Sequence, residues 1–258
     1  MVGWFFTFSI YVYNLFMIIS KKHKFIFYKP LKCAGTSVEW ALTIKFPLGQ
    51  NDISTGHAGY HQDYGDWSKN LDKYRYIADG RGEHYTPDKL KLVWPLLSDI
   101  PIEDFKIITI ARDPIGQLVS YYWWAHTNPT MGAFCPDACP VNGDTRKDIY
   151  RKFVLWLNKP YRAAIFKDWT SAPIETPVET LIRINEAMVA EADTVLLHSD
   201  LQNECKEKLG IKFPLPKMKS GKKVIADKAS DYFFNNKKLL NDILTSFPIS
   251  VKYLKNDS

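Results

Sequence analysis

The sequence contains few cysteines, no internal repeats and no low-complexity segment. Its four cysteines, Cys33, Cys135, Cys139 and Cys205, are irregularly spaced among 258 residues, which excludes a fold built on a disulfide framework. A bridge between Cys135 and Cys139 stays open, because it would close only a short loop. A domain of this length buries roughly three quarters of its unfolded surface, so it needs neither a metal nor a disulfide to fold.

A strong excess of one charge is also missing. The 34 Lys and Arg residues stand against 28 Asp and Glu residues, which gives a net charge of +6. This small positive excess favours an anionic ligand, but it is smaller than the positive charge of a nucleic-acid-binding tail, so no nucleic-acid partner is expected. The composition of 46% hydrophobic and 24% charged residues excludes a disordered, collagen-like or coiled-coil chain.

No hydrophobic run reaches the length of a membrane span. The uncharged stretch at residues 4–20 is shorter than the about 20 apolar residues of a spanning helix and is interrupted by polar side chains. It lacks a preceding basic stretch and a cleavage site, which argues against a secretory signal peptide. We therefore divide the chain into an apolar N-terminal segment at 1–23 and a main domain at 24–258. We expect a cytoplasmic location, and residues 4–20 have three open roles: a membrane span, association with a membrane surface, or packing against the fold.

Strands and helices alternate along the rest of the chain. Residues 105–111 form a mainly apolar run of the kind buried in a parallel sheet, and Thr86 followed by Pro87 is a typical helix start. The pattern predicts an α/β fold in three layers (α/β/α), with a central parallel sheet. The expected strands are 24–28, 74–78, 105–111 and 194–197; the expected helices are 36–44, 86–97, 115–126, 146–157, 178–190, 199–208 and 228–246; long loops are expected at 47–72 and 127–145.

The first strand runs into a helix through the short turn KPLKCAGTS at residues 29–37. We predict that this helix starts at Thr36 and that Glu39, three residues later, completes a capping box. Backbone N–H groups at such a helix start bind anions with the help of the helix dipole. Gly35 would let an anion approach the backbone, and Lys32 would add a mobile positive charge. The alternative is an ordinary strand–turn–helix with a surface lysine.

The second turn follows the apolar strand and reads ARDPIGQLVSYY at residues 111–122. Arg112 stands at the carboxyl end of the strand, where ligands bind in open α/β sheets. A guanidinium there can hold a phosphate through two parallel hydrogen bonds, and Ser120, two turns along the next helix, can add a hydroxyl. Asp113 predicts the start of that helix. The alternative for Arg112 is an ion pair with Asp113 or with a carboxylate of the core.

The two turns differ from the phosphate loop of nucleoside triphosphatases, G-x-x-x-x-G-K-[ST]. No lysine follows Gly35, Pro30 occupies the position of the first glycine, and Arg112 stands where a magnesium-binding acid would be expected. We therefore predict a site that holds phosphate without a metal. A nucleotide-dependent kinase stays an alternative function, and so does a protein that binds a nucleotide or an anionic glycan without catalysis.

Taken together, the turns resemble the sulfotransferases that use 3′-phosphoadenosine 5′-phosphosulfate (PAPS), in particular the carbohydrate branch that includes heparan and chondroitin sulfotransferases. The family loop P-K-T-x-G-T-S matches residues 31–37, and the family element R-[DN]-P-x-x-R-x-x-S-x-Y matches residues 112–122. A later segment at 195–216 is also similar, so the resemblance covers about residues 24–225. It implies a P-loop-like fold, PAPS as sulfate donor and no metal. The implied 5′-phosphosulfate site consists of Lys32, Cys33, Ala34, Gly35, Thr36 and Ser37, and the implied 3′-phosphate site of Arg112 and Ser120.

Three positions depart from the family pattern. Leu31 stands where proline is usual, Gln117 replaces the second arginine, and Ser199 stands where an acid is common. The change at 117 would loosen the 3′-phosphate site or remove a structural ion pair.

The resemblance also implies a general base. His84 lies 28 residues before Arg112, at the place of the family's proposed base, and an imidazole with a pKa near 7 suits deprotonation of an attacking hydroxyl. Glu83 is the second candidate. The pair His57 and His61 is spaced like two metal ligands, but no third ligand follows at usable spacing.

The implied reaction is a single in-line displacement. Lys32 counters the charge that develops on the bridging oxygen, and His84 takes the acceptor's proton. A basic segment at 217–223 would close over the nucleotide or form a solvated surface. The expected acceptor is a hydroxyl of a carbohydrate, whose rings could stack on aromatic side chains; packing in the core is the alternative for these, and the oligomeric state stays open. The aromatic candidates are Trp67, Tyr121, Tyr122, Trp123 and Trp124.

Overall fold

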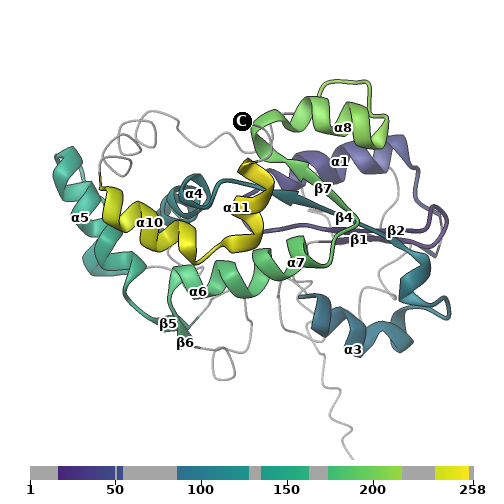
Figure 1. Ribbon diagram of the computed structural model, residues 1–258, viewed down its shortest axis with the longest axis horizontal. Coiled ribbons are helices and arrows are strands. Elements are labelled where there is room, and N and C mark those ends of the chain that lie inside the picture. Colours follow the sequence, from purple (N-terminus) through teal and green to yellow (C-terminus); the bar gives the residue numbers. More distant parts are fainter. Residues whose placement is uncertain are drawn as a thin grey trace, which may run out of the picture.

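The structure is a computed structural model, and it describes residues 17–49, 51–54, 86–127, 135–162, 174–216 and 236–255. It has an α/β fold in which a central sheet is flanked by helices on both faces (Figure 1). The predicted alternation of strands and helices is therefore confirmed over these residues. The strand expected at 74–78 lies outside them.

Among the described residues, five strands form the central sheet in the order β3-β1-β2-β4-β7. The strands β2, β4 and β7 are parallel, whereas β1 is antiparallel to both β2 and β3, so the sheet is mixed rather than wholly parallel. The strand bounds are Met17–Ser20 for β1, Phe25–Tyr28 for β2, Ile53–Ser54 for β3, Lys106–Ala111 for β4 and Thr194–Leu197 for β7.

The N-terminal boundary drawn at residue 24 needs correction. Met17 pairs with Tyr28 and Ser20 pairs with Phe25, so β1 and β2 form a hairpin that this boundary would cut. Every residue of β1 is buried. The end of the apolar run is thus a strand of the sheet, and apolar residues are there because both faces of the strand are covered. No helix among the described residues has the length and apolar character needed to cross a membrane.

Nine α-helices occur among the described residues, together with a small antiparallel ribbon of β5 (Tyr161–Arg162) and β6 (Ile174–Glu175). The predicted helix at 178–190 is a run of α6, one π-helical turn at Ile182–Glu186, and α7. The helix bounds are Gly35–Lys45 for α1, Pro87–Leu97 for α3, Pro114–Thr127 for α4, Arg146–Leu157 for α5, Pro177–Leu181 for α6, Ala187–Ala190 for α7, Leu201–Leu209 for α8, Lys237–Thr245 for α10 and Pro248–Lys255 for α11.

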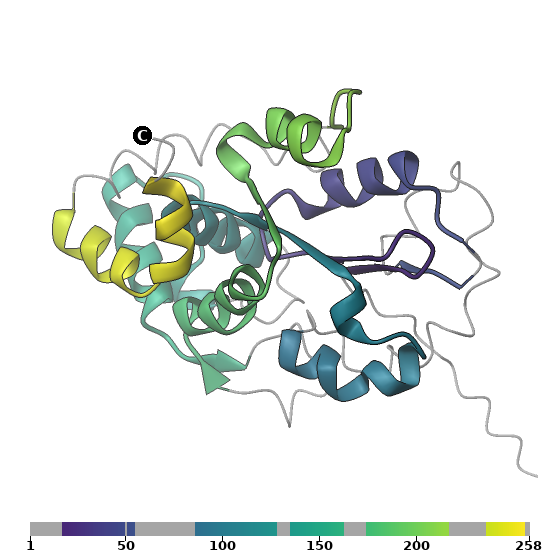
Figure 2. The same ribbon diagram turned by 45° about the vertical axis from the view of Figure 1, so that its right-hand side comes forward.

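The two faces of the sheet bury different side chains. Alternate residues of a strand point to opposite faces, and Ile18 and Phe27 pack with the residues of α1 and α8 on one face. Ile19 and Ile26 pack on the other face, in the cluster that contains Trp94 of α3. Figure 2 shows α1 and α8 on one side of the sheet and α3, α6 and α7 on the other. The order of layers is therefore helix, sheet, helix.

Candidate functional site

The candidate site lies at the carboxyl edge of the parallel strands. Ala111, the last residue of β4, pairs with Leu197, the last residue of β7, and β2 lies on the other side of β4. Arg112 and His198 are therefore the first residues beyond two neighbouring strands. The turn after β2 reaches the same edge, where ligands bind in open sheets. The two turns predicted from the sequence are thus brought together.

The turn between β2 and α1 has an unusual backbone. Lys32 and Ala34 have φ angles of 60° and 57°, in the left-handed region, which costs roughly 1–2 kcal/mol for a residue other than glycine. Helix α1 begins at Gly35, one residue earlier than predicted, with Ala34 as its N-cap. No side chain caps this helix start. The predicted capping box of Thr36 and Glu39 is therefore wrong.

Glu39 has a different partner, Lys29. The Lys29 ammonium lies 2.6 Å from one Glu39 carboxylate oxygen, and both residues are only 4% exposed. The second oxygen of Glu39 has no hydrogen-bond partner among the described residues. Thr36 lies inside α1, whose N-cap is Ala34, so it cannot form the predicted box with Glu39, and Glu39 pairs with Lys29 instead.

Gly35 is needed because the Lys29 side chain passes over it. A Cβ atom added to Gly35 would lie 2.4 Å from Cγ of Lys29, far inside contact distance. The sequence predicts that Gly35 lets an anion approach the backbone. In the structure the space above its Cα is filled by the lysine stem, so this glycine serves the buried Lys29–Glu39 pair.

Arg112 joins the two turns. Its Nη1 donates a hydrogen bond of 2.6 Å to the carbonyl oxygen of Lys32. Its Nε is buried and has no hydrogen-bond partner among the described residues. Asp113 instead accepts a hydrogen bond of 2.6 Å from the Gly116 amide at the start of α4, as predicted for a helix-capping residue. Within the described ranges no ion pair of Arg112 with a carboxylate occurs.

The Lys32 side chain lies against α4. Its ammonium is 5.4 Å from the ring centroid of Trp124, within the range of a cation–π interaction. Trp124 is half-buried and stacks on Tyr121 at a centroid distance of 5.8 Å. The cation expected to act in catalysis is thus held beside an aromatic face. Ser120, on the same helix, is also half-buried.

The remaining residues of the first turn differ in exposure. Ala34 is exposed and Thr36 is half-buried, whereas Cys33 and Ser37 are buried. Burial raises the pKa of the Cys33 thiol to about 12, although Arg112 acts in the opposite direction. Cys33 therefore stays a neutral thiol near neutral pH and is no candidate for a nucleophile.

His198 is a site residue that the sequence does not single out. Burial, and secondly the positive charge of Arg112, lower the pKa of His198 to about 4. The imidazole is therefore neutral at pH 7 and can bind as a neutral donor or acceptor. The available sequence signal is its position directly after the predicted strand at 194–197, which matches the position of Arg112 after its own strand.

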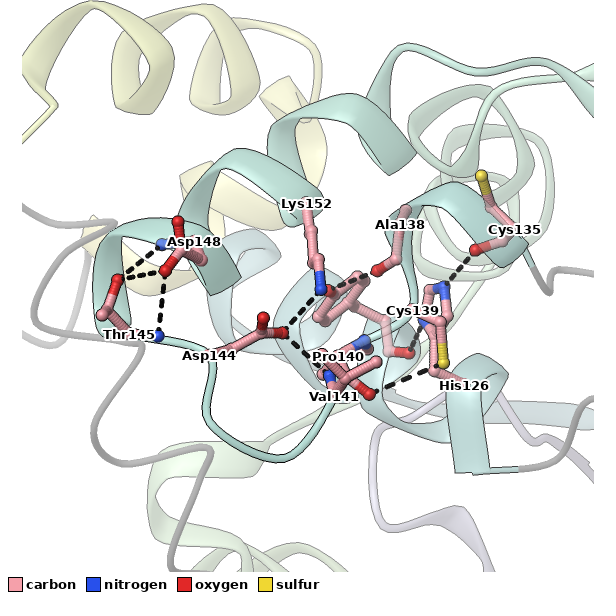
Figure 3. A network of polar contacts seen from close by, with 11 residues as sticks. His126, Cys135, Ala138, Cys139, Pro140, Val141, Asp144, Thr145, Asp148 and Lys152 are labelled. Carbon is pink, nitrogen blue, oxygen red and sulfur yellow. Dashed lines mark hydrogen bonds and ion pairs between the residues drawn. The ribbon is translucent and has the colours of Figure 1, made fainter.

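A second polar network, around the Cys135–Cys139 segment, is structural. Figure 3 shows His126 between two backbone carbonyls: Nδ1 is 2.7 Å from the oxygen of Tyr122, and Nε2 is 3.3 Å from that of Cys135. Burial lowers the pKa of His126, so the ring is neutral. Cys135 and Cys139 are free thiols, which answers the open question of a bridge for this structure.

The aromatic candidates for sugar stacking separate into two groups. Tyr121 and Tyr122 are fully buried and pack edge-to-face on Trp156, so they belong to the core. Trp123 and Trp124 are half-buried. Only the second group has an exposed part that a sugar could contact.

Several predicted residues cannot be placed. His84 and Glu83, the two candidate bases, lie outside the described residues, and so do Trp67, the pair His57 and His61, and the basic segment at 217–223. Among the residues that are described, no group of three or more His, Cys, Asp or Glu side chains could hold a metal ion.

Comparisons with known proteins add no family assignment. No family model, no curated protein and no solved structure matches this chain.

Proposed function

We propose that the chain is a sulfotransferase that moves the sulfuryl group of PAPS to a hydroxyl of a carbohydrate acceptor. One observation carries the proposal: Arg112 donates to the carbonyl oxygen of Lys32. The two cations that the resemblance assigns to the two ends of the nucleotide donor therefore belong to one connected site. The proposal includes a P-loop-like form of the α/β fold.

The donor set suits a nucleotide with several negative charges. Lys32 and Arg112 are cationic, and α1 begins without a side-chain cap, so its N–H groups and dipole face the same edge. The buried Nε of Arg112 is a further donor that lacks a partner within the described part of the chain. The one carboxylate beside Arg112 in sequence, Asp113, is engaged at the start of α4. We propose that Arg112 and Ser120 hold the 3′-phosphate and that residues 32–37 hold the 5′-phosphosulfate.

The residues have separate tasks in the proposed reaction. The acceptor oxygen forms a bond to sulfur while the bond from sulfur to the 5′-phosphate oxygen breaks, and Lys32 counters the negative charge on that leaving oxygen. His84 takes the acceptor's proton, with Glu83 as the alternative base. No metal is part of the proposal.

The carbohydrate acceptor is supported by the neighbourhood of Lys32. The half-buried Trp124 ring lies under the lysine ammonium, and aromatic faces beside a catalytic group suit the apolar faces of sugar rings. The cytoplasmic location is proposed from the sequence alone.

The decisive experiment is to incubate the full chain with radiolabelled PAPS and a panel of glycans, lipids and phenols. We expect label on a glycan. Label on a phenol or lipid would support sulfotransferase activity but contradict the proposal of a carbohydrate acceptor. Tight nucleotide binding without any transfer would indicate a protein that binds the nucleotide without catalysis.

Variants separate the two phosphate sites. We expect Arg112→Ala to weaken binding of 3′-phosphoadenosine 5′-phosphate about 10- to 100-fold, because charge-assisted hydrogen bonds are lost. Binding of adenosine 5′-phosphate should weaken by a smaller factor, because only the contact of Arg112 with the Lys32 carbonyl oxygen is lost there. Lys32→Ala should weaken the binding of both nucleotides. Isothermal titration calorimetry measures both, and Lys206→Ala, an exposed lysine on α8, is the matched control. His84→Ala should spare binding and remove turnover; retained turnover would reject His84 as the base.

A further inference from the structure

A π-helical turn interrupts the helix that runs from α6 to α7, on the face of the sheet opposite α1. It covers Ile182–Glu186 and is continuous with regular helix on both sides. Such turns are rare, and they often occur at functional sites because they redirect side chains. The side chain that matters here is that of Asn185, which is 2% exposed.

Asn185 binds the turn between β2 and α1 through both ends of its amide. The Leu31 N–H donates to Asn185 Oδ1 at 2.9 Å, and Asn185 Nδ2 donates to the Leu31 carbonyl oxygen at 3.2 Å. The two residues are 154 positions apart in the chain. An amide is suited to this pair of contacts, because it offers one acceptor and one donor at the same time.

The same peptide is held from a second helix. Gln117 of α4 donates to the Leu31 carbonyl oxygen at 2.6 Å and to the Cys33 sulfur at 2.9 Å. The next residue is Lys32, whose backbone is left-handed and whose carbonyl oxygen accepts from Arg112. The unfavourable backbone conformation of Lys32 is thus fixed by contacts on both sides of it, which is how strained residues persist at functional sites.

We infer that Asn185 is a positioning residue for Lys32: it holds the Leu31 peptide so that the Lys32 side chain is presented at the anion site. Asn185 acts through the backbone and does not touch the nucleotide. The identity of the nucleotide rests on the proposed function, whereas the effect of Asn185 on the turn does not. Gln117, which replaces an arginine of the family pattern, supports the same peptide.

The neighbouring residue Glu186 provides a matched control. It is also buried and belongs to the same π-helical turn, but it accepts hydrogen bonds from the Ile249 and Ser250 amides and the Ser250 hydroxyl at the start of α11. It therefore fixes α11 and makes no contact with the turn before α1 among the contacts described. A change at Glu186 disturbs the π-helical turn but leaves the two hydrogen bonds between Asn185 and Leu31 in place.

The test compares Asn185→Asp with Glu186→Gln in the full chain. An aspartate is isosteric with asparagine but cannot donate to the Leu31 carbonyl oxygen, and its charge repels that oxygen. We expect Asn185→Asp to weaken binding of 3′-phosphoadenosine 5′-phosphate about tenfold and to lower kcat, whereas Glu186→Gln lowers the thermal midpoint and leaves affinity and kcat unchanged. Equal affinity and kcat in wild type and Asn185→Asp would overturn the inference.

A ligand-independent measurement separates this inference from the proposed function. Native-state hydrogen exchange reports the opening of individual amides, and we expect the Leu31 amide to exchange at least tenfold faster in Asn185→Ala, which lacks the oxygen that accepts from it, than in Glu186→Gln. If wild type fails to bind the nucleotide but this difference is seen, the proposed function fails and the positioning role stands. If exchange at Leu31 is the same in both variants, the positioning role fails. Should Asn185→Asp not fold, Asn185→Ala, which removes both hydrogen bonds to Leu31 without adding a charge, is judged by the same affinity and kcat measurements.

Discussion

Helices α1 and α5 both follow an irregular segment, but they begin in different ways. At α5 the Thr145 hydroxyl accepts from the Asp148 amide at 3.2 Å, and the Asp148 carboxylate accepts from the Thr145 amide at 3.0 Å. Figure 3 shows this reciprocal capping box. At α1 the N-cap is Ala34, which is left-handed and has no capping side chain. The start of α5 is capped by side chains of its own first turn, whereas the start of α1 has no side-chain cap.

The difference separates a structural helix start from a candidate ligand site. The start of α5 is defined within four residues, which satisfy its first N–H groups locally. The turn before α1 is instead fixed by Arg112, Gln117 and Asn185, which are 80, 86 and 154 positions away from their partners. Long-range contacts fix the backbone there, while the N-terminus of α1 has no side-chain cap.

The largest effect is expected from Lys29→Ala, which breaks the buried Lys29–Glu39 ion pair beside the start of α1. Glu39 would stay buried without its cation, and breaking a buried ion pair in this way costs about 3–5 kcal/mol of unfolding free energy. Urea denaturation at pH 7 measures the loss. The double variant Lys29→Met/Glu39→Leu removes both charges and should recover most of it. A loss below about 1 kcal/mol in the single variant would mean that the pair contributes little to this helix start.

This contrast also shows what the sequence can predict. The strands at 105–111 and 194–197 and the order of the two turns follow from apolar runs and helix-start residues, which are local signals. The box predicted for Thr36 and Glu39 is wrong because α1 begins before Thr36, with the left-handed Ala34 as its N-cap, and Glu39 pairs with Lys29, a residue outside that four-residue pattern. Asn185 could not be found, since its role depends on a π-helical turn and on a partner 154 residues away.

The strand β1 was missed for a related reason. Residues 17–20 are as apolar as a membrane segment, and a strand that is buried on both faces has the same composition. Only its pairing with β2 distinguishes the two. Similarly, His198 becomes notable only when β7 is placed beside β4, because the register then brings it next to Arg112.

Lowering the pH is expected to have an intermediate effect on the unfolding free energy, through protonation of His198. The ordinary pKa of histidine is about 6.5, and the folded pKa of His198 is about 4, so the unfolded chain binds the proton first as pH falls. Stability from this residue is therefore complete above pH 6.5 and is lost as pH decreases toward 4. Complete burial would make the loss about 3 kcal/mol, and partial exposure reduces it to roughly 1–2 kcal/mol.

Urea denaturation of wild type and His198→Gln at pH 7 and pH 5 measures how much unfolding free energy is lost through His198 as the pH falls. The decrease between the two pH values should be smaller in the variant, and an equal decrease would contradict the neutral state of His198. Asp148 at the start of α5 differs in its window: hydrogen bonds from Thr145 lower the pKa of its carboxyl below 3.8, so its contribution is lost only below about pH 4. His198, at the sheet edge of the candidate site, and Asp148, at the start of α5, therefore lose their contributions to stability in different pH ranges.

The smallest effect is expected from Thr145→Ala, which removes the side-chain N-cap of α5. Loss of a threonine N-cap costs about 1 kcal/mol, and the pKa of Asp148 should rise toward its ordinary value because its main hydrogen-bond donor is gone. Nucleotide affinity should not change, since the cap closes a helix start that makes none of the contacts holding the turn before α1. Unfolding and calorimetric titration of the same preparation measure both quantities. A loss of affinity equal to that of Asn185→Asp would mean that the two helix starts are coupled, and the separation of a structural start from a ligand-binding start would then fail.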